Sequence, residues 1–276
     1  MALRHIPVSL VLAALPLAAI EEGNTPRTMS RAEQEEFLRT AKPLRHKQVG
    51  KGVTGAERFT LAKGDVKHDA HFQKIDQQLK EFNPPTGEAE LRFRDSYKYN
   101  IAAYELGKLL GIDDMIPPSV ERRVFGTTGA LTWWVDNVLM DETKRLKGGV
   151  QPPNVDNWND QMDVVHIFDQ LIQNMDRNTG NLLMTRDWKI EMIDHTRAFR
   201  ISKKLRNVAN VRRCDNALLA KMRALDKHTL EQHAGRWLDA LEIAGLLARR
   251  DRLLEHIDSL VKQKGAENVL YDRPKP

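Results

Sequence analysis

Glycine and proline divide the sequence into two unlike parts. Up to about Met140, short apolar runs such as 58–61 and 66–75 alternate with glycines, a pattern typical of strands joined by turns. After the segment GGVQPP (148–153), apolar residues recur at helical spacing in DQMDVVHIFDQLIQN and through 216–265. The strand candidates of this second part are NLLMT and KIEMID. The pattern predicts an α+β protein with a strand-rich N-lobe and a helical C-lobe.

Two helices are predicted in the first part of the chain. SRAEQEEFLR opens with Ser30 and has Glu33 three residues later, which is a capping-box pattern. DSYKYNIAAYELGKLLG is amphipathic and closes at Gly111. We therefore expect an N-terminal helical extension at 21–41, an N-lobe at 42–140 and a C-lobe at 141–276.

Composition narrows the classes of function. With 41% hydrophobic and 29% charged residues, the 276-residue chain is an ordinary globular protein. A net charge of +5 is too small to predict a nucleic-acid partner. The single cysteine, Cys214, excludes an internal disulfide framework and a cysteine-based zinc site.

The first twenty residues resemble a secretory signal peptide. Arg4 and His5 precede an apolar run that ends in Ala18-Ala19, and this run is too short for a transmembrane helix. We expect cleavage near residue 20 and export to the periplasm or the medium. The alternatives are a mis-assigned start codon or an N-terminal core helix, with a cytoplasmic protein. We expect no transmembrane segment after the signal.

Two polar clusters stand beside buried apolar segments. QNMDRNTGNLL contains Asp176 and Asn181, and EMIDHTRAF contains Asp194. A carboxylate can accept the proton of a substrate hydroxyl, while an amide oxygen and a second carboxylate suit Mg²⁺ bound to phosphates. A hairpin between Asn181 and Asp194 would bring these two side chains together. The clusters predict a catalytic Asp176 and metal ligands at Asn181 and Asp194.

The same motifs resemble those of a known group of enzymes. DRNTGNLL followed by MIDHTRAF is similar to the catalytic and metal-binding segments of the atypical kinases that include phosphatidylinositol 3- and 4-kinases. NMDR, DHTRAF and NIAAYELGKLLGIDDMIPP resemble still more the secretory-pathway kinases related to the Golgi casein kinase. The resemblance covers roughly residues 48–200. It implies a two-lobed protein-kinase-like fold with ATP and Mg²⁺ or Mn²⁺ between the lobes.

The resemblance also implies a phosphate-binding lysine and a partner glutamate in the small lobe. The related kinases carry Phe-Lys in a strand, whereas this chain has Phe72-Gln73-Lys74. Lys74 and Lys67 are the candidates for the lysine. Asn100 stands where the glutamate is expected, which leaves Glu105 as the candidate for that role.

Three further features bear on nucleotide and substrate binding. Gly50, Gly52 and Gly55 have the spacing of a phosphate-covering glycine loop, although a hairpin turn explains them equally well. In TWWVDNV, Trp134 and Val135 are expected to line the adenine pocket, with a plain core role as the alternative for either tryptophan. The basic run 200–213 holds no acid and predicts an acidic or phosphorylated acceptor, or else a solvated surface.

The sequence therefore predicts an exported, ATP-dependent phosphotransferase that modifies a hydroxyl group. Within the same fold, transfer of AMP is a competing possibility. The alternative from another class is a pseudokinase that binds a nucleotide and serves as a non-catalytic scaffold.

Overall fold

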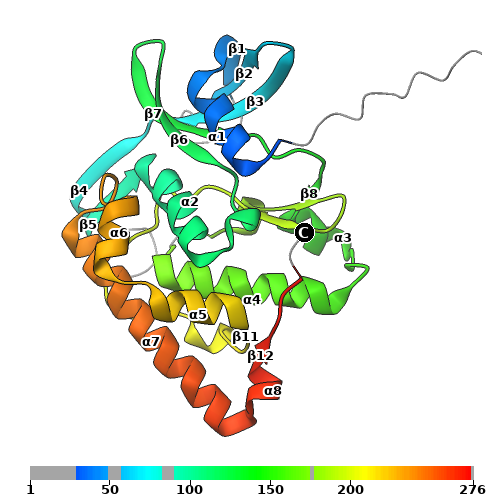
Figure 1. Ribbon diagram of the computed structural model, residues 1–276, viewed down its shortest axis with the longest axis vertical. Helices are drawn as coiled ribbons and strands as arrows, with labels where there is room; N and C mark the ends of the chain where they lie inside the picture. Colours follow the sequence, from blue (N-terminus) through cyan, green and yellow to red (C-terminus); the bar gives the residue numbers. More distant parts are fainter. Residues whose placement is uncertain (1–28, 49–56, 83–89, 175–176, 275–276) are drawn as a thin grey trace, which may run out of the picture.

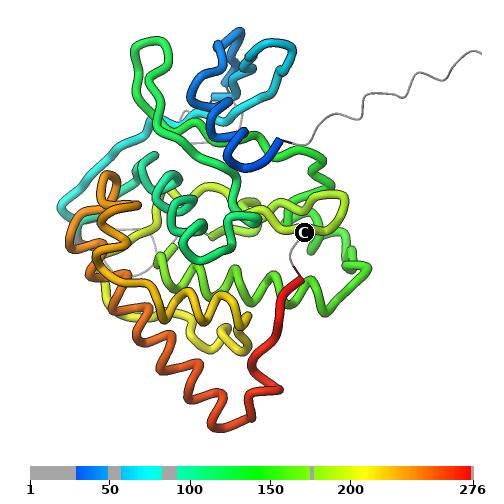
Figure 2. Tube along the Cα trace, viewed as in Figure 1, coloured from blue at the N-terminus to red at the C-terminus, as the bar shows by residue number. Residues whose placement is uncertain are grey.

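A computed structural model describes residues 29–48, 57–82, 90–174 and 177–274. Figures 1 and 2 show an upper part built on a sheet and a lower part built on helices, with α2 (Lys98–Leu110) between them. The larger hydrophobic core lies in the helical part and includes the apolar face of α2, whereas a second core lies in the sheet part.

The upper part contains an antiparallel five-stranded sheet with the strand order β1-β2-β3-β7-β6. Its strands are β1 (Lys42–Gln48), β2 (Glu57–Lys63), β3 (Val66–Gln73), β6 (Ser119–Val124) and β7 (Thr127–Trp133). Successive side chains of a strand point to opposite faces. Phe59, Ala70, Phe72 and Leu131 therefore share one face with other buried apolar residues.

Helix α1 (Arg31–Thr40) covers this apolar face and contributes Phe37 and Leu38 to its core. The side chain of Ser30 accepts a hydrogen bond from the Glu33 amide, and the Glu33 side chain bonds back to the Ser30 amide. The predicted capping box is thus present. Because α1 occupies one face of the sheet, only the other face is available to border a cleft.

A two-stranded hairpin, β4 (Asp76–Phe82) and β5 (Glu90–Ser96), lies between β3 and α2 in the chain. Helix α2 ends at Gly111, whose φ of 68° is the left-handed conformation that glycine adopts without strain. The short 3-10 turn η1 (Asp113–Met115) then leads into β6.

The lower part is mainly helical. A three-stranded sheet, β10-β9-β8, borders it on the side of the cleft. Its strands are β8 (Val138–Asp141), β9 (Leu182–Thr185) and β10 (Ile190–Met192), and a parallel pair joins β11 (Cys214–Asp215) to β12 (Leu270–Tyr271). The helices are α3 (Glu142–Gly148), α4 (Val155–Ile172), α5 (Asn216–Ala224), α6 (Lys227–Ala234), α7 (Ala240–Lys264) and α8 (Ala266–Val269), with 3-10 turns η2 (Thr179–Asn181) and η3 (Val208–Asn210).

The α+β organisation predicted from the sequence is confirmed: strands dominate the N-terminal part and helices the C-terminal part. The predicted hairpin NLLMT–KIEMID is the pair β9 and β10. Among the described residues, no helix is both long enough and apolar enough to span a bilayer. The expected signal peptide lies outside the described residues.

Candidate functional site

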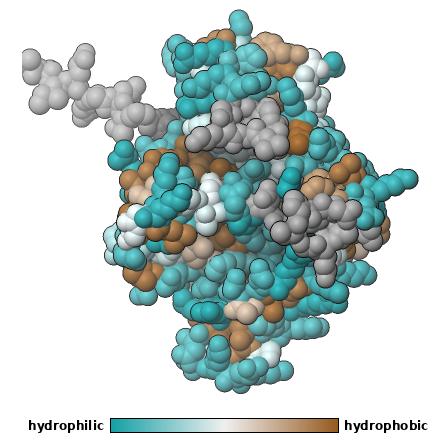
Figure 3. All heavy atoms as spheres, turned by 180° about the vertical axis from the view of Figure 1, so that it is seen from behind, coloured by the Kyte–Doolittle hydropathy of each residue, from teal (hydrophilic) through white to brown (hydrophobic). Residues whose placement is uncertain are grey.

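A cavity of about 1050 Å³ lies between the five-stranded sheet and the three-stranded sheet. Its wall includes residues of β2, β3 and β7 above and of β8, β9 and β10 below, together with the 134–137 segment that connects β7 to β8. In the view of Figure 3, hydrophobic side chains gather at the level where the two parts meet. Concave sites of this size are the usual place for a ligand.

The roof of the cavity is polar because α1 has taken the apolar face of the sheet. Arg58 and His71 are paired across β2 and β3, and Thr132 of β7 is paired with His71. All three residues line the cavity, as does Gln73 at the end of β3. Burial lowers the pKa of His71, although the nearby Asp194 carboxylate opposes this effect. His71 is therefore expected to be neutral at pH 7.

The segment 134–137, which follows β7, lines one side of the cavity. Trp134 and Val135, which the sequence analysis expects to border adenine, both line this cavity. The Arg58 guanidinium lies 4.0 Å above the ring of Trp134 and pairs with Asp69. The neighbouring Trp133 side chain is 7% exposed and packs against Phe37 of α1. Trp133 thus belongs to the core of the sheet part and, like Trp134, also lines the cavity.

Asn181 and Asp194, the two predicted metal ligands, line the lower wall together. Asn181 ends η2, and its carbonyl accepts a hydrogen bond of 3.0 Å from the Ile193 amide. Asp194 has a φ of 56°, a left-handed conformation that non-glycine residues adopt rarely and often at functional sites. The Thr196 hydroxyl donates to the Asp194 carboxylate at 3.2 Å. The fold therefore brings together two oxygen-bearing side chains that are thirteen positions apart.

Arg177 holds the segments that carry these two residues. Its guanidinium forms an ion pair with Asp169 of α4 at 3.0 Å. It also donates to the Asn181 carbonyl at 3.1 Å and to the Ile193 carbonyl at 2.7 Å. One side chain thereby attaches both backbone segments of the lower wall to a long helix.

Two buried amides connect the roof to the lower wall. Gln73 of β3 and Asn100 of α2 are 3% and 5% exposed, and the Asn100 amide donates to the Gln73 side-chain oxygen. The Gln73 amide donates to the Asp194 carboxylate at 3.4 Å. The backbone amide of His195 donates to the Asn100 oxygen at 2.8 Å. These contacts join β3, α2 and the Asp194 segment in one buried chain.

His195 is a buried core residue in this arrangement. It is 2% exposed, and its ring lies edge-on to Phe168 with centroids 5.9 Å apart. Burial, and secondarily the charge of Arg177, hold its pKa well below the usual value. The imidazole is therefore expected to be neutral at pH 7.

The two charged candidates of the small lobe do not enter the cavity. Lys74 follows the end of β3 and pairs with Glu57 at 3.0 Å, with its side chain 46% exposed. Glu105 pairs with Lys108 on α2. Neither residue is part of the cavity wall, so the geometry does not support the prediction that they bind the nucleotide. For Lys74 the strand register is the reason, because it directs Gln73, the last residue of β3, into the cavity and leaves Lys74 outside the wall.

Four predicted residues lie outside the described part of the chain. These are the catalytic candidate Asp176 and the glycines of the proposed phosphate loop, Gly50, Gly52 and Gly55. In the sequence, Gln73 and Asn100 are departures from the kinase pattern without a predicted role. The positions of Arg58 and His71 in the cavity wall were not predicted, although strand alternation around Phe59 and Phe72 indicates them.

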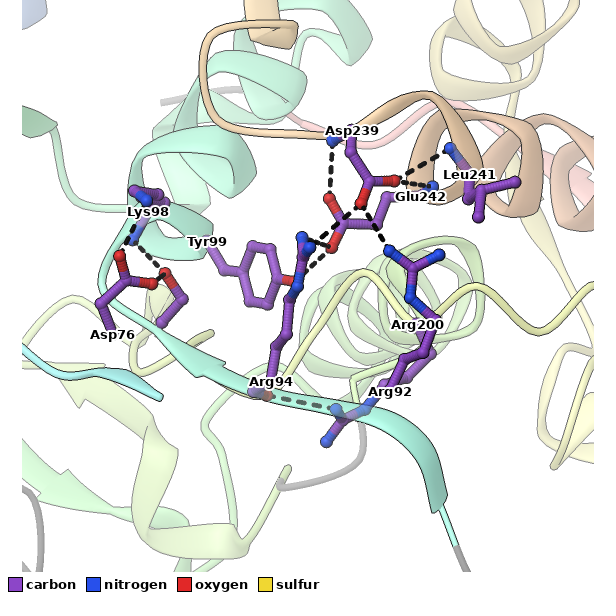
Figure 4. A network of polar contacts seen from close by, with 10 residues as sticks. Asp76, Arg92, Arg94, Lys98, Tyr99, Arg200, Asp239, Leu241 and Glu242 are labelled. Carbon is purple, nitrogen blue, oxygen red and sulfur yellow. Dashed lines mark hydrogen bonds and ion pairs between the residues drawn. The ribbon is translucent and has the colours of Figure 1, made fainter. Parts of the chain in front are cut away.

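A second cavity, of about 400 Å³, lies beside the start of α2. Figure 4 shows the polar network at this place. Arg94 pairs with Asp239 at 3.2 Å and with Glu242 at 2.6 Å, and Lys98 pairs with Asp76 at 2.7 Å. The Tyr99 hydroxyl also donates to Glu242. These charges satisfy one another, so this network joins β5 and α2 to the start of α7.

Comparison with solved structures places the fold. The chain is similar to hydra Fam20, determined with a sugar, with a TM-score of 0.66, 15% identity and coverage of 87% of this chain and 92% of that chain. It is also similar to the Helicobacter pylori proinflammatory kinase CtkA, with a TM-score of 0.52, 10% identity and coverage of 83% and 98%. No protein-family model and no curated protein matches the sequence.

These similarities define the class of the protein at the level of its fold. Both neighbours are atypical kinases, and Fam20 belongs to the Golgi casein kinase family, which is the group that the sequence motifs resemble. The chain therefore has a kinase-like fold, and the cavity of about 1050 Å³ lies between its two parts. The resemblance predicted from the motifs is confirmed at this level.

Proposed function

We propose that the chain is an ATP-dependent phosphotransferase that uses Mg²⁺ or Mn²⁺ and transfers a phosphoryl group to a hydroxyl acceptor. The observation that carries the proposal is the joint position of Asn181 and Asp194 on the wall of the cavity between the lobes. The kinase-like fold supports it, because catalysis of phosphoryl transfer consists largely of positioning and charge stabilisation.

The donor set fits a hard divalent cation. Asn181 offers an amide oxygen and Asp194 a carboxylate, and Mg²⁺ usually takes one or two such protein ligands beside phosphate oxygens. When bound, the cation neutralises negative charge on the phosphates. In this proposal Arg177 keeps the two ligand-bearing segments together, and Trp134 and Val135 border the base. Asp176, five positions before Asn181, accepts the proton of the acceptor hydroxyl.

The acceptor in this proposal is acidic or already phosphorylated. The segment that follows the Asp194 motif carries Lys203, Lys204, Arg206 and Arg212 as exposed cations. Positive side chains beside a transfer site raise the local concentration of a negatively charged partner. The proposal further places the protein outside the cytoplasm, on the basis of the signal-like first twenty residues. In keeping with this, Fam20 belongs to a group of secretory-pathway kinases.

One observation favours a second candidate function. Gln73 and Asn100 form a neutral pair in the place where kinases carry a lysine on a strand and a glutamate on the next helix. A chain that lacks this ion pair could bind a nucleotide and act as a non-catalytic scaffold. A measurement of phosphoryl transfer distinguishes the phosphotransferase from the non-catalytic scaffold.

The test uses purified protein, Mn²⁺, an acidic protein as acceptor and ATP labelled at either the γ- or the α-phosphate. Phosphoryl transfer predicts that only the γ-label enters the acceptor or the protein itself, whereas AMP transfer predicts the α-label. Asp194→Asn should lower incorporation by about 100-fold or more. Asparagine suits this position because it tolerates left-handed backbone. Asp65→Asn, an exposed change in the β2–β3 turn, is the matched control. Nucleotide binding without any transfer would establish the scaffold.

A further inference from the structure

The side-chain amides of Asn100 and Gln73 link α2 to Asp194 through a series of hydrogen bonds that all run in the same direction from donor to acceptor. The His195 backbone amide can only donate, so the Asn100 oxygen faces it. The Asn100 amide group then faces Gln73, which must present its oxygen and direct its own amide group toward Asp194. Only this orientation of the two side-chain amides pairs a donor with an acceptor in every hydrogen bond of the series. The network therefore determines the orientation of both amides.

This series of hydrogen bonds takes the place of the lysine–glutamate ion pair that joins a strand and a helix of the small lobe in kinases. It ties α2 to β3 and ties both to the residues at 194 and 195. Burial of the two amides is tolerated because their hydrogen bonds replace those lost from water. The geometric role of an ion pair is thus served by neutral groups.

The Gln73–Asn100 pair does not supply the positive charge that a lysine would bring to the phosphates. A lysine beside phosphates supplies a full positive charge, whereas an amide supplies only a dipole. The described cations of the cavity wall are Arg58, Lys144 and Arg186. Arg58 pairs with Asp69 and Lys144 pairs with Asp141, while Arg186 lies beside the 134–137 segment, where its backbone amide donates to the Asn137 carbonyl. Beside Gln73 and Asn181 stands the negative carboxylate of Asp194. Phosphates that bind beside Asp194 therefore meet its carboxylate and the uncharged side-chain amides of Gln73 and Asn181.

We propose that the Gln73–Asn100 pair makes nucleotide binding by this chain dependent on the divalent cation, because the pair positions Asp194 without neutralising the phosphates. The inference rests on the nucleotide-binding part of the proposed function. It does not depend on transfer, since a kinase and a scaffold would both show it. The preferred ligand is therefore the metal–nucleoside triphosphate complex rather than the free nucleotide.

The experiment measures ATP binding by calorimetry with Mn²⁺ and, separately, with EDTA. For the natural chain, removal of the metal should weaken ATP binding by about 100-fold. The double variant Gln73→Lys with Asn100→Glu restores an ion pair. Because a charge-assisted hydrogen bond contributes roughly 10- to 100-fold in affinity, its binding in EDTA should recover by at least about tenfold. Lys74→Gln removes a neighbouring exposed lysine and should behave like the natural chain.

Gln73→Lys alone is the second variant, in case the double variant fails to fold as judged by circular dichroism. It should also raise the affinity in EDTA by about tenfold. Equal affinity of the natural chain with Mn²⁺ and with EDTA would overturn the inference and leave the proposed nucleotide site intact. Lysine variants that gain no affinity in EDTA would overturn it as well. No ATP binding even with Mn²⁺ would overturn the proposed function together with the inference.

Discussion

At the scale of single residues, Arg177 shows how one side chain can organise a site without lining it. Its guanidinium reaches α4 through Asp169, and it reaches the Asn181 and Ile193 carbonyls through two further hydrogen bonds. Arginine offers five donors in a rigid planar fork, which lysine does not. The relative position of the two proposed ligands therefore depends on a residue that stands four positions before Asn181.

Asp163 of α4 provides a prediction about pH. Burial raises the pKa of its carboxyl to about 6, although Arg213, 3.8 Å away, opposes this, and the Asp160 carboxylate raises it further. A folded-state pKa above the unfolded value of about 3.9 means that this group stabilises the fold only when protonated. That contribution is complete below about pH 4 and is lost as the pH rises through 6.

Asp163→Asn should therefore raise the free energy of unfolding at pH 8, by about 1 kcal/mol after allowance for solvent screening. At pH 4 the variant and the natural chain should unfold alike. Urea titrations followed by circular dichroism at pH 4, 6 and 8 measure this difference. A difference that stays constant across the three pH values would contradict the assignment to Asp163.

Some residues of the site could be predicted from the sequence, whereas others could not. Asn181 and Asp194 stand out because short polar groups interrupt apolar strands, and this signal is local. The choice between Gln73 and Lys74 depends on the strand register, and a shift of one residue reverses the face. The kinase resemblance favours a lysine, whereas pairing of Gln73 with Ala130 of β7 directs the glutamine into the cavity. Register is set by neighbouring strands, which a single sequence does not display.

At the scale of elements, the sequence predicted helix ends from capping residues and buried strands from apolar alternation, but it did not predict strands that are held only by backbone pairing. The capping box of α1 and the glycine that ends α2 were both predicted and are both present. By contrast, β1 and β4 were not predicted, because nearly all their side chains are exposed and show no apolar alternation. Such strands are held by backbone pairing to partners that the local pattern does not reveal.

Gly129 of β7 provides a prediction at this scale. A Cβ atom built at this position would lie 2.4 Å from the Gln73 carbonyl oxygen and 2.7 Å from the ring of Phe72. Gly129→Ala must therefore push β3 away from β7 at Gln73, whose side chain donates to Asp194. We expect a loss of about 1–3 kcal/mol in the free energy of unfolding, as for other overpacked sites.

The same substitution should weaken binding of ATP with Mn²⁺, which calorimetry measures. Gly148→Ala is the control, because its Cβ would meet only the end of the Val150 side chain, at 3.3 Å. If both variants unfold at the same urea concentration, the close approach of β3 to Gly129 is not a constraint in solution.

At the scale of the whole molecule, both ends of the described chain attach to the turn η1. Arg31 of α1 donates to the Asp114 carbonyl at 2.8 Å, and Arg273 near the C-terminus donates to both oxygens of the Asp114 carboxylate at 2.8 and 2.9 Å. These partners are 83 and 159 positions apart in sequence. Contacts of this range leave no local pattern, so the sequence predicted α1 but not where it attaches.

Removal of the Asp114 carboxylate should therefore destabilise the entire fold. The Arg273 side chain is 2% exposed, and a buried guanidinium that loses its carboxylate partner costs about 3–5 kcal/mol. Asp114→Ala should lower the free energy of unfolding by that amount, measured by urea denaturation at pH 7. Asp113→Ala in the same turn leaves the carboxylate of Asp114 in place and should lower it by less than about 1 kcal/mol. Equal effects of the two substitutions would show that the Asp114–Arg273 pair does not hold the C-terminal segment to the molecule.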